Sequence, residues 1–177
     1  MGIVLPAIGC TFQTIEPGHV GLAYAPSAGL QRSVIPSSRV LLGHFCAFHA
    51  CNTLYDFDIT YSTTHEQIRT AASGDDPAMT VRMDVIYRPI ISEIYELATE
   101  VGTNGGYYNK VVAPELRSAA GAVLAGRGSS DFVGVHKYQL EDAIEKEVRR
   151  RINGKHVELA SITIESIEPT TRSPSCP

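Results

Sequence analysis

The residues with the greatest chemical potential in this sequence lie between positions 44 and 51, which read His-Phe-Cys-Ala-Phe-His-Ala-Cys. Two imidazoles and two thiolates could form the closed tetrahedral set that zinc favours. On a regular strand, however, His44 and Cys46 face one way while His49 and Cys51 face the other. Zinc ligands also usually come from two separated knuckles. We therefore expect a partly buried strand and loop in which cysteine acts as a small hydrophobe. A small structural zinc module is the alternative.

The same segment contains the two partners of a cysteine hydrolase. Cys46 or Cys51 would be the nucleophile, and His44 or His49 the base. The sequence offers no third orienting group and no oxyanion donor, and sequence neighbours rarely assemble such sites. We therefore expect a protein that is not an enzyme, with no catalytic residues and no cofactor.

Cys10 suggests a different chemistry, which is lipidation. Residues 1–10 are apolar and uncharged, and Ala7-Ile8-Gly9 directly before the cysteine resembles the processing site of a bacterial lipoprotein signal. A true signal also has a basic start and a longer apolar run, and both are missing here. Residues 1–10 are therefore expected to be an N-terminal tail, either a remnant of such a signal or a disordered segment with an ordinary cysteine.

Composition limits the classes of partner. The 177 residues fit one domain with a self-sufficient core, and 44% hydrophobic and 19% charged residues are values of a globular protein. A net charge of −4 argues against nucleic acid, which requires clustered Lys and Arg. The one dense basic run, Arg149 to Arg151, follows acidic residues on the same predicted helix, which favours a solvated, self-paired face. The sequence has no run approaching the ~20 apolar residues that span a bilayer.

The elements that would position these residues begin as strands. Met79 to Arg88 alternates apolar and polar side chains, which predicts a strand with one buried face. Tyr55 to Tyr61 alternates in the same way. Glu16-Pro17-Gly18 suits a type II turn, and we expect it to join Thr11–Ile15 and Val20–Tyr24 as a hairpin.

Helical spacing of apolar residues follows the strand at Met79. It predicts helices over 90–101 and 107–124, and a third helix with apolar residues at four-residue steps up to Ile152. Residues 156–167 return to strand, with a change of parity near Ala160 that suggests a bulge. This order predicts an α+β fold, a curved and mainly antiparallel sheet packed with about three to four helices.

Three motifs in this order resemble one family. They are Ile-Glu-Pro-Gly-His-Val-Gly at 15–21, Val-Val-Ala-Pro-Glu-Leu-Arg-Ser at 111–118, and Val-Glu-Leu-Ala-Ser-Ile-Thr-Ile-Glu-Ser-Ile at 157–167. Together they resemble the SPFH (band 7) domain of prohibitins, stomatins and flotillins. The resemblance covers residues 11–169, and residues 170–177 are expected to be a disordered tail.

The resemblance implies a function without chemistry. Members of this family are non-enzymatic membrane organisers that oligomerise, often into rings, and bacterial relatives frequently associate with a membrane-bound protease. The resemblance therefore implies a membrane-associated scaffold in a bacterial cell envelope. The partners of this scaffold would be the lipid surface, further copies of the chain and such a protease, but not nucleic acid. The family's anchor is missing unless Cys10 supplies it. Pro169, Pro174 and Pro177 exclude the long heptad helix that usually follows, so we expect a truncated or minimal member.

The resemblance also assigns roles to individual residues. Leu140, Ile144 and Val148 would pack the helical layer on the sheet, while Glu115 and Arg117 would be fold or subunit contacts. A Glu and an Arg two positions apart on a helix diverge by ~200°, so these two side chains cannot form one acid–base pair.

Overall fold

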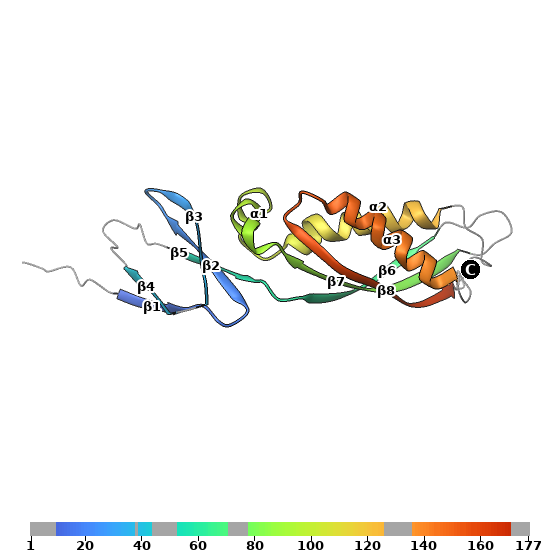
Figure 1. Ribbon diagram of the computed structural model, residues 1–177, viewed down its shortest axis with the longest axis horizontal. Helices are drawn as coiled ribbons and strands as arrows, with labels where there is room; N and C mark the ends of the chain where they lie inside the picture. The colour runs from blue at the N-terminus through green and yellow to red at the C-terminus, as the bar shows by residue number, and fades with distance from the viewer. Residues whose placement is uncertain (1–9, 38, 44–52, 71–77, 126–135, 171–177) are drawn as a thin grey trace, which may run out of the picture. The chain divides into compact units, whose positions relative to one another are not determined.

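The computed structural model describes residues 10–37, 39–43, 53–70, 78–125 and 136–170 (Figure 1). They belong to two compact units, residues 1–60 with 89–106 and residues 61–88 with 107–177. The first unit contains β1 (Cys10–Thr14), β2 (His19–Ala25), β3 (Gly29–Ile35), β4 (Arg39–Gly43), β5 (Thr53–Asp58), a 3-10 turn (Ile91–Glu93) and α1 (Ile94–Glu100). The second contains β6 (Ser62–Arg69), β7 (Met79–Pro89), the π-helical turn η2 (Tyr108–Val112), α2 (Ala113–Leu124), α3 (His136–Ile152) and β8 (Val157–Pro169).

The first unit is organised around β2, which pairs antiparallel with β3 on one edge and β5 on the other. The predicted turn before β2 is present. The amide of His19 donates to the carbonyl of Glu16 at 3.1 Å, and Gly18 has φ +86°, as the third residue of a type II turn requires.

The predicted hairpin across that turn is wrong. β1 pairs with β4, placing Cys10 opposite Gly43, and β2 forms its hairpin with β3. Both edges of β2 are already occupied by β3 and β5, so the Glu16–His19 turn redirects the chain without joining two paired strands.

The predicted strand from Tyr55 to Tyr61 is also shorter than expected. β5 ends at Asp58, whose Oδ1 accepts hydrogen bonds from the Thr60 amide at 2.8 Å and the Thr60 hydroxyl at 2.6 Å. This side-chain turn competes with the ladder and ends the strand. The following strand, β6, belongs to the second unit and was not predicted.

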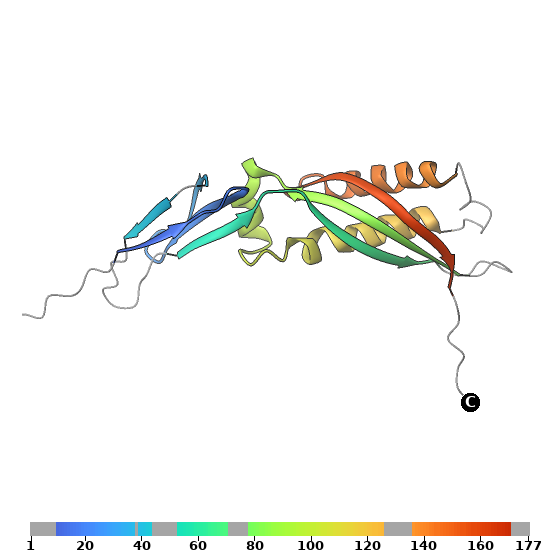
Figure 2. The same ribbon diagram turned by 90° about the horizontal axis from the view of Figure 1, so that it is seen from below.

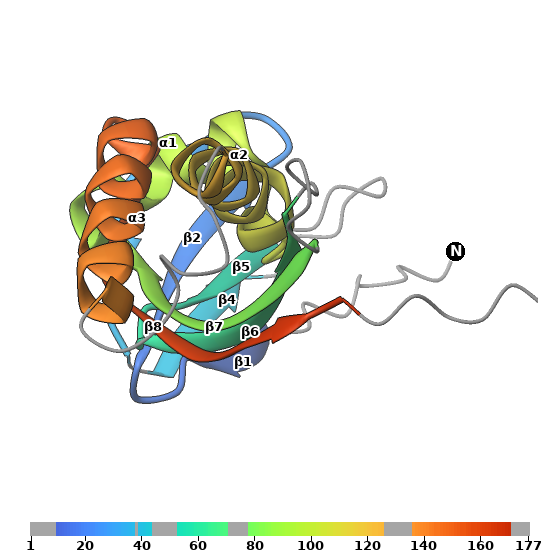
Figure 3. The ribbon, with the colours of Figure 1, turned by 90° about the vertical axis from the view of Figure 1, so that its right-hand side faces the viewer.

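The second unit is a three-stranded sheet with the order β6-β7-β8, covered on one face by α2 and α3 (Figures 2 and 3). β7 is central, and its alternation matches the prediction, since Val81, Met83 and Val85 are fully buried while Arg82 is exposed. In β8 the buried positions change parity between Leu159 and Ile162, as predicted. The α+β fold class is confirmed.

Two carboxylates of α3 also bind the backbone of β8. The amides of Ile162 and Ile164 donate to Glu145 at 3.2 Å and to Glu141 at 2.7 Å. Because β8 lies at the edge of its sheet, these contacts satisfy donors that an edge strand would otherwise present to another chain.

Candidate functional site

The α3 residues assigned to the fold lie inside the second unit. Leu140, Ile144 and Val148 have no exposed surface, and their four-residue spacing gives α3 one continuous apolar face. Their side chains are therefore buried by the unit's own layers.

Glu115 and Arg117 point to different partners, as their spacing on α2 requires. Glu115 accepts from Lys155 Nζ at 2.5 Å, while Arg117 Nη2 donates to Glu66 at 3.0 Å. The Glu66 side chain on β6 is only 9% exposed, whereas that of Arg117 is 59% exposed. Glu66 thus links the sheet to α2, and Arg117 leaves much of its guanidinium accessible.

A tyrosine completes this network at the start of the helical layer. The hydroxyl of Tyr108, in the π-helical turn, donates to Glu66 at 2.7 Å, and its ring stacks on Tyr87 at 4.8 Å between centroids. Burial, and then the Glu66 hydrogen bond, raise the pKa of Tyr108 far above its ordinary value. Tyr108 therefore keeps its proton and donates to Glu66 across the physiological range.

The arginine run on α3 is self-paired, as predicted. Arg149 bonds Glu145 at 2.8 Å, and Arg150 and Arg151 both bond Glu147, at 2.7 and 2.8 Å. Hydrogen bonds from Arg150 and then Arg151 lower the pKa of Glu147 to about 2. Arg149 also donates to the carbonyl of Ala160 in β8 at 2.8 Å, and Arg151 to the hydroxyl of Ser118 in α2 at 2.6 Å, so the arginine run also joins α3 to its neighbours.

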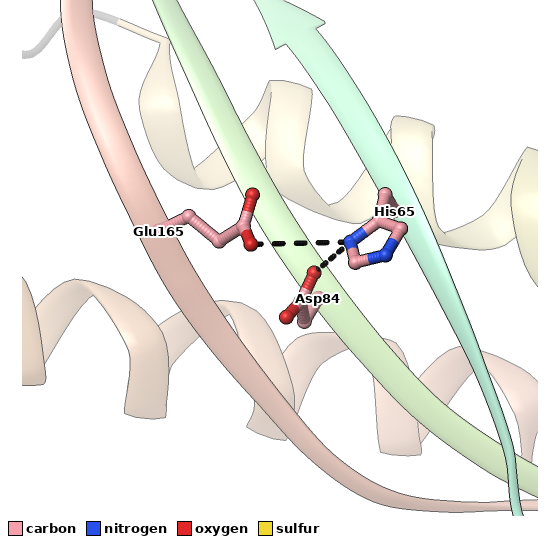
Figure 4. A group of neighbouring side chains, drawn as sticks. All are labelled: His65, Asp84 and Glu165. Atoms are coloured by element: carbon pink, nitrogen blue, oxygen red, sulfur yellow. Dashed lines mark hydrogen bonds and ion pairs between the residues drawn. The ribbon is translucent and has the colours of Figure 1, made fainter.

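The sheet face opposite α2 and α3 carries a second polar group. His65, Asp84 and Glu165 come from β6, β7 and β8 and turn toward one another (Figure 4). His65 Nδ1 forms a hydrogen bond with Asp84 Oδ1 and lies 3.9 Å from Glu165 Oε1. One nitrogen or oxygen atom from each of the three side chains lies within 4.8 Å of the other two. This is the one group among the described residues whose side chains could together hold a metal ion.

Sequence reasoning missed this trio. The alternation of Met79 to Arg88 places Asp84 on the polar face, but β6 was not predicted and Glu165 lies beyond the change of parity in β8. The signal would have been the cross-strand register, in which His65 stands directly opposite Asp84.

The remaining predicted residues are placed only in part. Cys10 is the first residue of β1. The four residues of the zinc and hydrolase alternatives, His44, Cys46, His49 and Cys51, lie outside the described residues.

An antiparallel β-rich unit and a three-stranded sheet with two helices on one face define an α+β protein. The family model for the SPFH domain / Band 7 family matches residues 13–172. The chain belongs to this family, which in general comprises membrane-associated, non-enzymatic scaffolds. The search of curated proteins finds no match to the chain. Among the described helices, none has the length and apolar character needed to cross a membrane.

Proposed function

We propose that this protein is a membrane-associated scaffold that assembles from several copies and organises membrane or regulates a membrane-bound protease. The observation that carries the proposal is the family match, which extends over 160 residues from 13 to 172 and includes the described parts of both units.

Cys10 is the proposed point of attachment. It begins β1, so an acyl chain on its thiol would be joined to a strand that pairs with β4. One acyl chain gives only marginal, reversible binding to a bilayer. Several chains in one assembly bind together with much higher avidity, so attachment and oligomerisation support each other.

Of the residues to which the sequence assigned a fold or subunit contact, Arg117 is the one proposed to contact another subunit. Its side chain is 59% exposed while it bonds Glu66, and a guanidinium has five N–H donors, so donors remain for a neighbouring copy. Glu115, paired with Lys155, and the buried Leu140, Ile144 and Val148 are proposed to serve the fold.

The attachment is tested by fractionating cells that express the complete gene product. We expect Cys10→Ser to move the protein from the membrane to the soluble fraction. Cys176→Ser, which removes the tail cysteine, is the matched control and should leave the protein in the membrane fraction. Equal membrane fractions for wild type and Cys10→Ser would contradict lipidation at this residue.

The protease partnership needs a separate test, because a scaffold can assemble without it. Chemical cross-linking in the native membrane, followed by mass spectrometry, should join this chain to a membrane-bound protease. Cross-links that connect only copies of this chain would restrict the proposal to membrane organisation.

A further inference from the structure

We propose that His65, Asp84 and Glu165 form a binding site for a divalent transition-metal ion on the sheet face opposite α2 and α3. The proposal does not depend on the proposed scaffold function. Three adjacent strands each supply one of these side chains, and His65 and Asp84 are direct cross-strand neighbours (Figure 4).

The distances suit a shared ion. Imidazole nitrogen and carboxylate oxygen lie about 2.0–2.2 Å from bound zinc, so two ligands of the same ion can be no more than about 4.4 Å apart. His65 Nδ1 and Glu165 Oε1 are 3.9 Å apart, and all three ligand atoms lie within 4.8 Å of one another. The Glu165 side chain is 47% exposed, so it has room to rotate toward the other two ligands.

The donor types select the class of ion. Imidazole suits zinc and its neighbours among the first-row metals, while carboxylates also accept harder cations. One imidazole and two carboxylates therefore fit an ion such as Zn²⁺, with three protein ligands and water in the remaining positions. The exposure of His65, at 74% of its side chain, leaves those positions open to solvent.

Charge on this face also favours a cation at the trio. The neighbouring arginines have carboxylates of their own, since Arg88 pairs with Glu158 and Arg82 lies 3.5 Å from Glu168. Among the described residues, no lysine or arginine pairs with Asp84 or Glu165. The two carboxylates therefore share only the His65 ring, and a dication would neutralise both.

The backbone that carries the ligands is held by the core. Asp84 lies between Met83 and Val85, which are fully buried on the opposite face of β7. Fixed strands reduce the conformational entropy that a metal site loses on binding. Because the trio points away from α2 and α3, removing one ligand should leave the core intact.

The test is equilibrium dialysis of the full chain against Zn²⁺, followed by elemental analysis. We expect His65→Ala and Glu165→Gln each to retain one Zn²⁺ per chain fewer than wild type. Glu165→Gln is the sharper variant because it removes a ligand charge and leaves the His65–Asp84 hydrogen bond in place. Circular dichroism establishes that each variant is folded.

His19→Ala is the matched control. His19 bonds Asp56 at 2.7 Å in the first unit, but this pair has no third ligand within reach among the described residues. His19→Ala should retain as much Zn²⁺ as wild type, and ions bound at residues 44–51 would appear equally in every variant. Unchanged Zn²⁺ in Glu165→Gln, or an equal loss in His19→Ala, would overturn the proposal.

Discussion

The Glu66 carboxylate holds two donors from the helical layer, Tyr108 and Arg117. Replacing it with alanine would leave a half-buried hydroxyl and a guanidinium without their acceptor, which costs more than a single hydrogen bond contributes. We expect Glu66→Ala to lower the free energy of unfolding by about 2–3 kcal/mol. Gln67→Ala, at the exposed neighbour on β6, should change it by less than about 0.5 kcal/mol. Urea unfolding followed by circular dichroism measures both, and equal losses would contradict the role of Glu66.

Tyr108 gives a pH dependence whose sign follows from its raised pKa. The unfolded chain releases the phenolic proton near pH 10, while the folded chain retains it, so stability falls as pH rises above about 10. Tyr108→Phe cannot titrate and should lose less stability over that range than wild type. Unfolding free energies at pH 9 to 11 would show the difference. Parallel curves would mean that Tyr108 is not held in its protonated form.

Glu147 gives the opposite dependence at acid pH. Its pKa is lowered to about 2 from an ordinary value of 4.5, because Arg150 and Arg151 bond the charged carboxylate. The stabilisation is fully present above about pH 4.5 and is lost as pH falls toward 2. Glu147→Gln should therefore destabilise the protein at pH 7 and have less effect near pH 2. Thermal midpoints at both values test this, and an equal shift at each would contradict it.

At the scale of elements, α3 is held by its apolar face. Ile144 has no exposed surface, so Ile144→Ala should cost about 2–5 kcal/mol through lost burial and the cavity that remains. Tyr138 on the same helix is 74% exposed, and Tyr138→Ala should change stability by no more than about 0.5 kcal/mol. Denaturant midpoints compare the two variants. A large loss with Tyr138→Ala in the isolated chain would contradict the assigned helix face.

The turn before β2 depends on a glycine. Gly18 has φ +86°, and an added Cβ would lie 2.8 Å from Thr60 Cγ2, so Gly18→Ala should destabilise the first unit by about 1–2 kcal/mol. Gly121 in α2 has open space around its position, and Gly121→Ala should stabilise the second unit by about 0.5–1 kcal/mol. Thermal unfolding distinguishes the two, and a change of the same sign in both would contradict the account.

The sequence could predict those strands and helices in which buried residues recur at the period of the element. β7 and α3 carry apolar residues at the period of their structure, so Val85 and Ile144 mark their buried faces. β6 could not be found in this way. Its core-facing positions include Thr64 and Glu66, which are polar and are satisfied by Tyr87, Tyr108 and Arg117 from other elements. The segment therefore lacks an apolar period.

The pairing of strands depended on information that a local pattern does not contain. The Glu16–His19 turn was identified from Pro17 and Gly18, but β1 pairs with β4, whose residues lie 25 to 33 positions further along the chain. The His65 trio is non-local for the same reason, since its ligands come from three strands. Motif order, by contrast, was sufficient to predict the family, because each motif retains its place along the chain.

At the scale of the whole molecule, the proposed scaffold function requires assembly at a membrane. The family match supports a scaffold, and a single acyl chain at Cys10 would hold one copy only marginally. The protein should therefore reach the membrane as a multimer, and its partitioning should weaken when the assembly is disrupted.

The most direct measurement is the mass of the full-length gene product after gentle extraction from its native membrane. Light scattering behind a sizing column gives that mass independently of shape. We expect an assembly of many subunits. A single-chain mass over the working range of concentrations would contradict it.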